Sequence, residues 1–381
     1  MKAYCLNKIS SVALSSLKGS DTIVDDINKA DAILVRSQAM HEMDLPSNIL
    51  AVARAGAGVN NIPLEKYARE GIVVFNTPGA NANAVKELVL CSLFLASRDI
   101  IGGNTWVNIN KNDEAISTNA EKEKSKFAGH EVLGKTIAVI GLGVIGVMVA
   151  NACDMLGMHV RGYDPYLTIT NAMRLNKNVK YYEDLEEAVS GVDFVTVHVA
   201  LTDSTRGMIN KTIFSKLNQA ILLNFSRDSL VNEDDLKEAL EKGNIKKYVS
   251  DFANTNVVKL PNTIILPHLG ASTEEAEDNC AMMAIDELKD FIENGNIIHS
   301  VNYPDVHNGV KYSEKRVCVL HQNIPGIIAK ITTTIMEYNS NITTFVNKSK
   351  GEYAYSVFDV DGMVDEKKIQ ALDGIIRVRI I

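Results

Sequence analysis

Apolar and polar positions along the N-terminal part of the chain follow the pattern of alternating strands and helices. Short apolar runs are each closed by polar or turn-forming residues, and helix-length amphipathic segments separate them. The runs predict strands at Lys2–Leu6, Ala32–Val35, Leu50–Ala53 and Ile72–Phe75. Such a series is typical of a parallel sheet whose strands are joined by helices.

A long helix and a polar stretch follow this first series. Apolar residues recur at helical spacing over Ala82–Ile101, which predicts one continuous helix. The next segment, Gly102–Gly129, is polar and only weakly periodic, so no regular element is predicted there. Its charged run, Glu121–Lys126, is interpreted as a solvated surface.

A second series of strands and helices begins at Lys135. Asn232 is placed to cap a helix that stops at Gly243, and after Pro267 a second long helix is predicted at Glu274–Glu293. The two long helices are interpreted as crossovers, so residues after Pro267 should complete the first lobe. The strands predicted in this series are Thr136–Ile140, His159–Tyr163, Phe194–Val199, Ile221–Phe225, Tyr248–Phe252 and Thr263–Leu266.

From about Lys315 the predicted order of elements changes to βαββαβ, a compact ferredoxin-like arrangement, after a polar linker at Asn302–Ser313. The whole chain is therefore predicted to be an α/β protein with two doubly wound parallel-sheet lobes, one flavodoxin-like and one Rossmann-like, plus a small α+β domain. The C-terminal elements are strands at Val317–Leu320, Ile342–Asn347, Tyr353–Asp359 and Ile375–Arg379, with helices near Ile327–Tyr338 and Glu366–Leu372.

Composition narrows the functional classes. The chain has 381 residues, which indicates two or three domains, and its 46% hydrophobic and 23% charged residues are ordinary for a globular protein. A net charge of −8 argues against a nucleic-acid partner. The five cysteines lie far apart without a CxxC pair, so neither a metal site nor a disulfide framework is expected. No apolar window is long enough for a membrane span, and a cytoplasmic location is expected.

A glycine-rich turn, Gly141-Leu-Gly-Val-Ile-Gly146, follows a predicted strand and precedes a predicted helix. The first glycine permits the turn, the second admits a pyrophosphate, and the third lets helix and strand pack closely. The next strand ends at Asp164, whose carboxylate would bind ribose hydroxyls and repel a 2′-phosphate, so NAD is preferred to NADP. The alternatives are a simple tight turn and an Asp-Pro turn.

Oxidation of a secondary alcohol needs a base for the hydroxyl proton and a cation for the substrate carboxylate. Arg227 and His268 each follow a predicted strand, where a doubly wound sheet places its active site. Taken singly, each could be a surface or structural residue. His198 is interpreted as a satisfied histidine near the cofactor. The candidates for cofactor contacts are Gly141, Gly143, Val144, Ile145, Gly146, Asp164, His198 and Asp251.

These motifs, together with Leu223–Asn232 and Pro267–Thr273, resemble the D-isomer-specific 2-hydroxy-acid dehydrogenases. Two further segments, Ala53–Asn61 and Phe75–Asn81, resemble the members of that family that act on D-3-phosphoglycerate. The resemblance implies an NAD-dependent oxidation to 3-phosphohydroxypyruvate, the entry step of L-serine synthesis.

The resemblance also implies which parts of the chain bind the substrate and which bind NAD. Residues 1–88 and 267–303 would form a substrate-binding domain and 89–266 an inserted NAD-binding domain, with the active site in the cleft between them. Arg227 would bind the substrate carboxylate and carbonyl, and His268 would exchange the proton. Arg54 and Asn81, and more weakly Arg36, would contact the phosphorylated substrate, although Arg54 and Asn81 could simply hold their loops.

One position departs from the family pattern. The family places a glutamate beside the catalytic histidine, and here Asn256 stands where that carboxylate is expected. An amide can orient the imidazole but cannot offset its charge. The resemblance therefore implies activity that is lower or has a shifted pH profile, unless the Asn254–Asn256 loop is rearranged.

The C-terminal unit, residues 314–381, resembles an ACT domain, with Leu320–Gly326 as its first loop. The resemblance implies binding of L-serine between two chains by His321, Asn323 and Asn341, and a homodimer or homotetramer. Two rival functions remain open at this point. One is action on another 2-hydroxy or 2-oxo acid, such as hydroxypyruvate or glyoxylate, and the other is a non-catalytic NAD(H)-sensing protein.

Overall fold

The computed structural model describes residues 1–17, 19 and 21–381. By compactness the chain divides into two units. The first contains residues 1–81 and 274–381, and the second contains residues 82–273. The second unit is therefore inserted into the sequence of the first.

The first unit contains a five-stranded parallel sheet in the order β2-β1-β3-β4-β5, the flavodoxin-like order. The four longer strands lie within one residue of their predicted positions, which confirms them. The short edge strand β2 was not predicted, because two residues carry no periodicity. The strands are β1 (Lys2–Cys5), β2 (Thr22–Ile23), β3 (Ala32–Val35), β4 (Ala51–Arg54) and β5 (Val73–Asn76).

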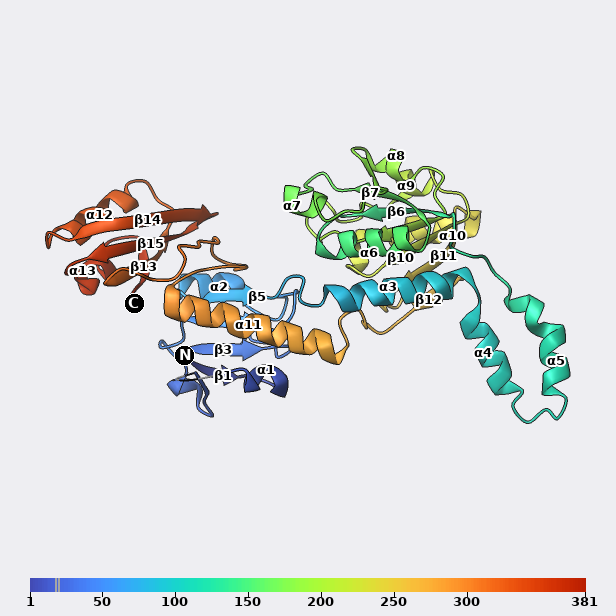
Figure 1. Ribbon diagram of the computed structural model, residues 1–381, viewed down its shortest axis with the longest axis horizontal. Coiled ribbons are helices and arrows are strands. Elements are labelled where there is room, and N and C mark those ends of the chain that lie inside the picture. The colour runs from blue at the N-terminus through green and yellow to red at the C-terminus, as the bar shows by residue number, and fades with distance from the viewer. Residues whose placement is uncertain (18, 20) are drawn as a thin grey trace. The chain divides into compact units, whose positions relative to one another are not determined.

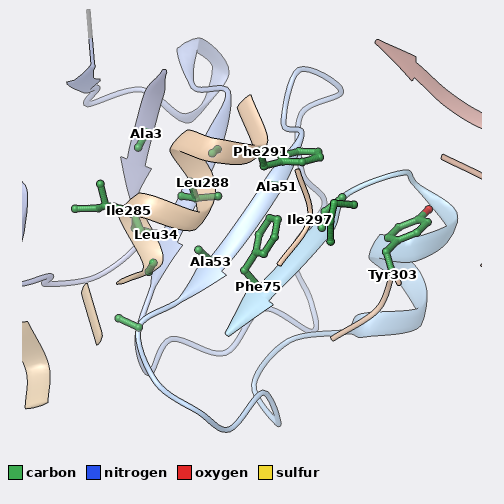
Figure 2. Packing of buried hydrophobic residues seen from close by; sticks show 14 of the residues in the cluster. Ala3, Leu34, Ala51, Ala53, Phe75, Ile285, Leu288, Phe291, Ile297 and Tyr303 are labelled. Carbon is green, nitrogen blue, oxygen red and sulfur yellow. The ribbon is translucent and has the colours of Figure 1, made fainter. Parts of the chain in front are cut away.

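The long helix α11 (Glu274–Asn294) covers one face of this sheet. In Figure 2 its side chains Leu288 and Phe291 lie beside residues of β4 and β5. The rings of Phe75 and Phe291 are 5.7 Å apart between centroids, and the alanines of β4 let the helix approach closely. The shorter helices of this part are α1 (Ser11–Ser15), η1 (Ile27–Lys29) and α2 (Leu64–Arg69).

The C-terminal part of the first unit is a four-stranded antiparallel sheet in the order β14-β15-β13-β16. Its βαββαβ sequence of elements confirms the prediction. One face packs on its own two helices, and the other face contributes Cys318, Leu320 and Tyr355 to the core that includes α11. The elements are β13 (Lys315–Gln322), α12 (Ile327–Met336), β14 (Asn341–Lys350), β15 (Tyr353–Asp361), α13 (Glu366–Gln370) and β16 (Ile375–Ile380).

The second unit is built on a seven-stranded parallel sheet in the order β12-β11-β10-β9-β6-β7-β8. Strand order reverses at β6, as in a Rossmann fold. All six predicted strands are present; β11 starts three residues earlier than predicted, and the short edge strand β8 was missed. The strands are β6 (Thr136–Ile140), β7 (His159–Tyr163), β8 (Lys180–Tyr182), β9 (Phe194–Val197), β10 (Ala220–Asn224), β11 (Ile245–Ser250) and β12 (Thr263–Ile265).

Helices flank this sheet and position the loops at its carboxyl edge. The predicted helix between Asn232 and Gly243 is confirmed, since the Asn232 side chain accepts from the Asp235 N–H and Gly243 adopts the left-handed conformation. The helices after β6 are α6 (Val144–Met155), α7 (Ile169–Ala172), α8 (Leu185–Val189), α9 (Lys211–Phe214), η3 (Asp228–Leu230), α10 (Glu233–Lys242) and η4 (Val257–Lys259).

The prediction for residues 82–129 was wrong in two respects. The expected single helix ends at Ser97 (α3, Ala82–Ser97), because Asp99 accepts from the Gly102 N–H and starts a new helix. The polar stretch that followed is also helical. It forms α4 (Ile100–Ile109), α5 (Ile116–Glu123) and η2 (Lys124–Phe127), none of which has a buried residue. In Figure 1, α4 and α5 extend away from the sheet of their unit.

Within the described part of the chain, no helix combines the length and the apolar character needed to cross a membrane.

Candidate active site

The glycine-rich turn joins β6 to α6 and leaves one position open to a ligand. A Cβ on Gly141, where φ is 92°, would lie 2.7 Å from the backbone of His198. A Cβ on Gly146 would lie 1.8 Å from the carbonyl oxygen of Gly141, whereas one on Gly143 would meet no atom within 4 Å. Gly143 is the N-cap residue of α6. The N-terminus of this helix therefore has room beside Gly143, which suits a pyrophosphate.

Asp164, which follows β7, is tied directly to this turn. Its Oδ2 accepts from the Leu142 N–H at 2.8 Å, and its Oδ1 accepts from the Tyr166 N–H at 2.9 Å. The second bond forms the Asp-Pro turn that sequence analysis left open as an alternative. Both interpretations are compatible, because each carboxylate oxygen retains a second acceptor site.

His198 follows β9 and lies beside the same turn. Burial lowers the pKa of this imidazole to about 3, so the ring is neutral at physiological pH. Its Nε2 lies 2.9 Å from the Thr196 hydroxyl, and its enclosed Nδ1 has no hydrogen-bond partner among the described residues. An orphaned polar atom beside an open glycine turn and a fixed carboxylate fits a dinucleotide.

Arg227 and His268 follow β10 and β12, the two neighbours of β11 in the sheet. Both side chains are exposed. Arg227 donates from Nη1 to the Ser226 carbonyl oxygen at 2.6 Å. The His268 backbone has the left-handed φ of 41°, unfavourable for a residue with a side chain. Its N–H donates to the Asp251 carbonyl oxygen at 2.7 Å, and its ring lies 5.0 Å from that of Phe252.

Asp251, at the end of β11, connects these two residues. Its buried carboxyl accepts from the Gly270 N–H at 2.8 Å through Oδ2, while Oδ1 has no partner in the part of the chain that is described. Burial raises the pKa of this carboxyl, and the Gly270 N–H and the charges of His268 and Arg227 oppose the rise. Arg227 and His268 thus lie within electrostatic reach of the same carboxylate.

The hydrogen bonds of Asn256 identify a residue, Glu233, that the sequence analysis missed. Its Nδ2 donates to Glu233 Oε2 at 2.8 Å, and the Nδ2 of Asn254 donates to Glu233 Oε1 at 2.6 Å. Glu233 belongs to the segment that the sequence identified only as a helix start. The signal that could have found it is the pair of asparagines two residues apart, which need acceptors.

The substrate candidates of the first unit follow adjacent strands of its sheet. Arg54 ends β4, Arg36 follows β3, and Asn81 lies in the loop after β5. Arg36 forms an ion pair with Glu277 at 2.6 Å, and both side chains are about 40% exposed. Burial raises the pKa of the Cys280 thiol, and the charges of Arg54 and Arg36 oppose this rise, so both guanidinium groups lie within electrostatic reach of this thiol.

The three serine-binding candidates have different environments. His321 is buried in β13, with Nδ1 2.8 Å from the Gln322 carbonyl oxygen and Nε2 2.9 Å from the Ser356 hydroxyl. Burial lowers the pKa of this histidine. Asn323 and Asn341 are exposed, and Asn323 donates to the Gly351 carbonyl oxygen at 3.2 Å. Two of the three candidates are therefore at the surface.

Comparison with known proteins agrees with this geometry. Residues 92–270 match the family model of the D-isomer specific 2-hydroxyacid dehydrogenase, NAD binding domain. D-3-phosphoglycerate dehydrogenase of Haemophilus influenzae is 32% identical over 87% of this chain and 81% of its own length. The Dictyostelium discoideum protein of the same name is 29% identical over 97% of this chain and 91% of its own.

Solved structures with the same fold include NAD+-bound 3-phosphoglycerate dehydrogenase of Entamoeba histolytica. It is 25% identical, has a TM-score of 0.61, and covers 79% of this chain and 98% of its own. With sequence, fold and nucleotide turn in agreement, this chain belongs to the D-isomer specific 2-hydroxyacid dehydrogenase family.

Proposed function

We propose that the protein oxidises D-3-phosphoglycerate to 3-phosphohydroxypyruvate with NAD+, the first step of L-serine synthesis. The observation that carries the proposal is the placement of Arg227 and His268 after strands on either side of β11, within electrostatic reach of Asp251. The names of the relatives, which match over most of both chains, support this substrate.

The chemistry divides simply among the side chains. His268 takes the proton of the substrate hydroxyl, and Arg227 holds the substrate carboxylate and polarises the forming carbonyl. When bound, NAD+ accepts the hydride from the carbon that carries the hydroxyl.

The phosphate distinguishes this substrate from smaller 2-hydroxy acids. We assign it to Arg54, with Asn81 as a hydrogen-bonding partner, because a guanidinium matches the geometry and charge of a phosphate. Arg36 is the weaker candidate, since its guanidinium already forms an ion pair with Glu277.

The direct test is the appearance of NADH with D-3-phosphoglycerate. We expect turnover that falls by roughly 100-fold or more in His268→Asn. Arg54→Ala should raise KM for D-3-phosphoglycerate at least about tenfold, while Arg69→Ala, which removes an exposed arginine of the same unit, leaves KM unchanged.

Two experimental outcomes would contradict the proposal and favour a different function. Turnover of hydroxypyruvate or glyoxylate that is insensitive to Arg54→Ala indicates another 2-oxo acid as substrate. A reductase with that activity has the same fold at 21% identity. NAD binding without turnover of any of these acids indicates a sensor, to which Asn256 lends some weight.

We further propose roles for the rest of the chain. Residues 1–88 and 267–303 bind the substrate, residues 89–266 bind NAD, and residues 314–381 form an ACT-like regulatory domain. L-serine would bind there near Asn323 and Asn341 between two chains, with His321 behind them. The expected inhibition by L-serine should disappear in Asn323→Ala, whereas inhibition that persists unchanged places the effector elsewhere.

A further inference from the structure

The first turns of α11 place an acidic side chain beside one of the substrate candidates of the first unit. Glu277 lies on this helix one turn before the buried Cys280, and its Oε1 is 2.6 Å from Nη2 of Arg36, which follows β3. The charges of Arg36, Arg54 and Glu277 all act on the Cys280 thiol. Two guanidinium groups and one carboxylate are therefore within electrostatic reach of a single thiol.

Hydrogen bonds hold the two backbone segments from which this ion pair extends. The Arg36 N–H donates to Asn7 Oδ1 at 2.9 Å, which joins the loop after β3 to the loop after β1. In that second loop, the Ser10 hydroxyl donates to Asp278, the neighbour of Glu277 on α11. The start of α11 and both loops are thus connected independently of the ion pair, so their positions do not depend on it.

The ion pair between Arg36 and Glu277 is weak enough to be exchanged for a stronger one. The Arg36 side chain is 41% exposed and that of Glu277 is 42% exposed. Ion pairs with this much access to water contribute little to stability, because solvent screens the charges. A phosphate dianion carries more charge than a carboxylate and offers three oxygens to the planar guanidinium. A phosphate that reaches Arg36 therefore displaces Glu277.

We propose that Glu277 is a specificity-determining residue, which occupies Arg36 until the phosphate dianion of the substrate displaces it. Before substrate binds, the carboxylate neutralises the charge of Arg36, so this arginine adds little attraction for a singly charged acid. Only a ligand whose bond to the guanidinium exceeds the lost ion pair gains affinity from Arg36. The inference rests on the proposed function for the assignment of the substrate phosphate to this part of the first unit.

The opposite role for Glu277 would be to hold Arg36 in place for the substrate, and the two roles predict effects of opposite sign. Removal of a residue that positions Arg36 weakens binding, whereas removal of a competitor strengthens it. Competition dominates here for two reasons. The backbone of Arg36 is already held by Asn7, and the negative charge of Glu277 repels a phosphate on whichever side of the guanidinium it binds.

The first test measures binding without turnover. Calorimetric titration of the NADH complex with D-3-phosphoglycerate gives Kd for each variant. We expect Glu277→Gln and Glu277→Ala each to lower Kd roughly threefold. Glu275→Gln removes the same charge from an exposed position of the same helix turn and should change Kd by less than about 1.5-fold. An unchanged or higher Kd in the Glu277 variants, or an equal decrease in Glu275→Gln, would overturn the inference. Melting temperatures check that all three variants fold.

A double-mutant cycle shows whether Glu277 acts through Arg36. In Arg36→Ala there is no guanidinium for the carboxylate to occupy. Adding Glu277→Gln to this variant should therefore change Kd much less than the same substitution does in the original protein. If Glu277→Gln lowers Kd equally with and without Arg36, the carboxylate acts by general repulsion of anions, and competition for Arg36 is contradicted.

Two further ligands test the specificity and separate this inference from the proposed function. D-glycerate is the same acid without the phosphate, so Glu277→Gln should leave its Kd unchanged; an equal decrease for both acids contradicts the role in specificity. Inorganic phosphate should bind roughly threefold more tightly to Glu277→Gln than to the original protein, and an unchanged Kd contradicts the inference. A protein that binds D-3-phosphoglycerate without oxidising it contradicts the proposed function only, because these titrations need no turnover.

Discussion

At the residue scale, the site depends on a few positions whose surroundings differ sharply. Gly146 and Gly143 belong to the same motif, yet the structure leaves space for a side chain only at Gly143. Sequence analysis could assign these different roles because the motif lies between a strand and a helix. It could not identify Glu233 as the partner of Asn256, because that contact joins the start of α10 to the loop after β11, two segments that only the folded sheet brings together.

The contrast between the two glycines yields a prediction. Gly143→Ala should leave the melting temperature unchanged but weaken NAD binding, because the new methyl group occupies the space where the pyrophosphate lies. Gly146→Ala should lower the melting temperature by several degrees, because its Cβ collides with the Gly141 carbonyl. Calorimetry of unfolding and of NAD binding checks both. Equal melting temperatures for the two variants contradict the packing role of Gly146.

Asp164 provides a second prediction at this scale. In Asp164→Asn the amide oxygen can still accept from one backbone N–H, but the charge that repels a 2′-phosphate is lost. We expect the ratio of kcat/KM for NADP+ to that for NAD+ to rise about tenfold, as for the loss of roughly 1.4 kcal/mol of repulsion. An unchanged ratio would show that a different group excludes NADP+.

At the scale of elements, periodicity identified the central strands of the two parallel sheets because burial on both faces gives continuous apolar runs. It failed for α4 and α5, where no residue is buried and no apolar stripe is required. It also joined α3 to α4, because the capping role of Asp99 is visible only once the Gly102 N–H is placed beside it. In the two parallel-sheet lobes, the elements with buried residues were therefore the ones that the sequence predicted best.

Helix α11 supplies a prediction about pH. Burial, with help from Asp305 and Asp286, raises the pKa of Glu287 from 4.5 to about 9, and its Oε1 lies 2.8 Å from His299 Nδ1. A raised pKa in the folded state contributes stability that is fully present below pH 4.5 and is lost as pH rises through about 9.

Because of this group, the free energy of unfolding is expected to fall by at most about 1.4 kcal/mol for each unit by which the pH rises. Glu287→Gln should remove this dependence and unfold at higher denaturant concentration than the original protein at alkaline pH. Urea unfolding at a series of pH values measures the effect, with Asp290→Asn on the same helix as the control. If the free energy of unfolding of Glu287→Gln keeps the original dependence on pH, another group causes that dependence.

At the scale of the whole molecule, the α4–α5 hairpin is notable because neither of its helices has a buried residue. Four of its apolar side chains are exposed by 44–76%, although polar residues would serve a solvated helix better. The homodimer or homotetramer that the family resemblance implies needs an exposed apolar surface of this kind for its contact. The four side chains are Ile100, Ile101, Val107 and Ile109.

A charge placed on this surface tests whether it forms that contact. We expect Ile109→Asp to lower the sedimenting mass of the assembly, because an aspartate cannot be buried in an apolar interface without a partner. Met173→Asp, at an equally exposed position on the same unit, should leave the assembly intact. Identical masses for all three proteins mean that the copies associate elsewhere.

The insertion of the second unit into the first has a consequence for synthesis on the ribosome. The helix that covers the first sheet is translated only after all of residues 82–273, and Ser10 bonds to Asp278 across 268 positions. Closing so long a loop by diffusion is slow while the intervening chain is disordered. The N-terminal strands of the nascent chain therefore remain exposed until the inserted unit has folded and brought α11 close to them. A chaperone that covers these strands during this interval should increase the yield of active protein.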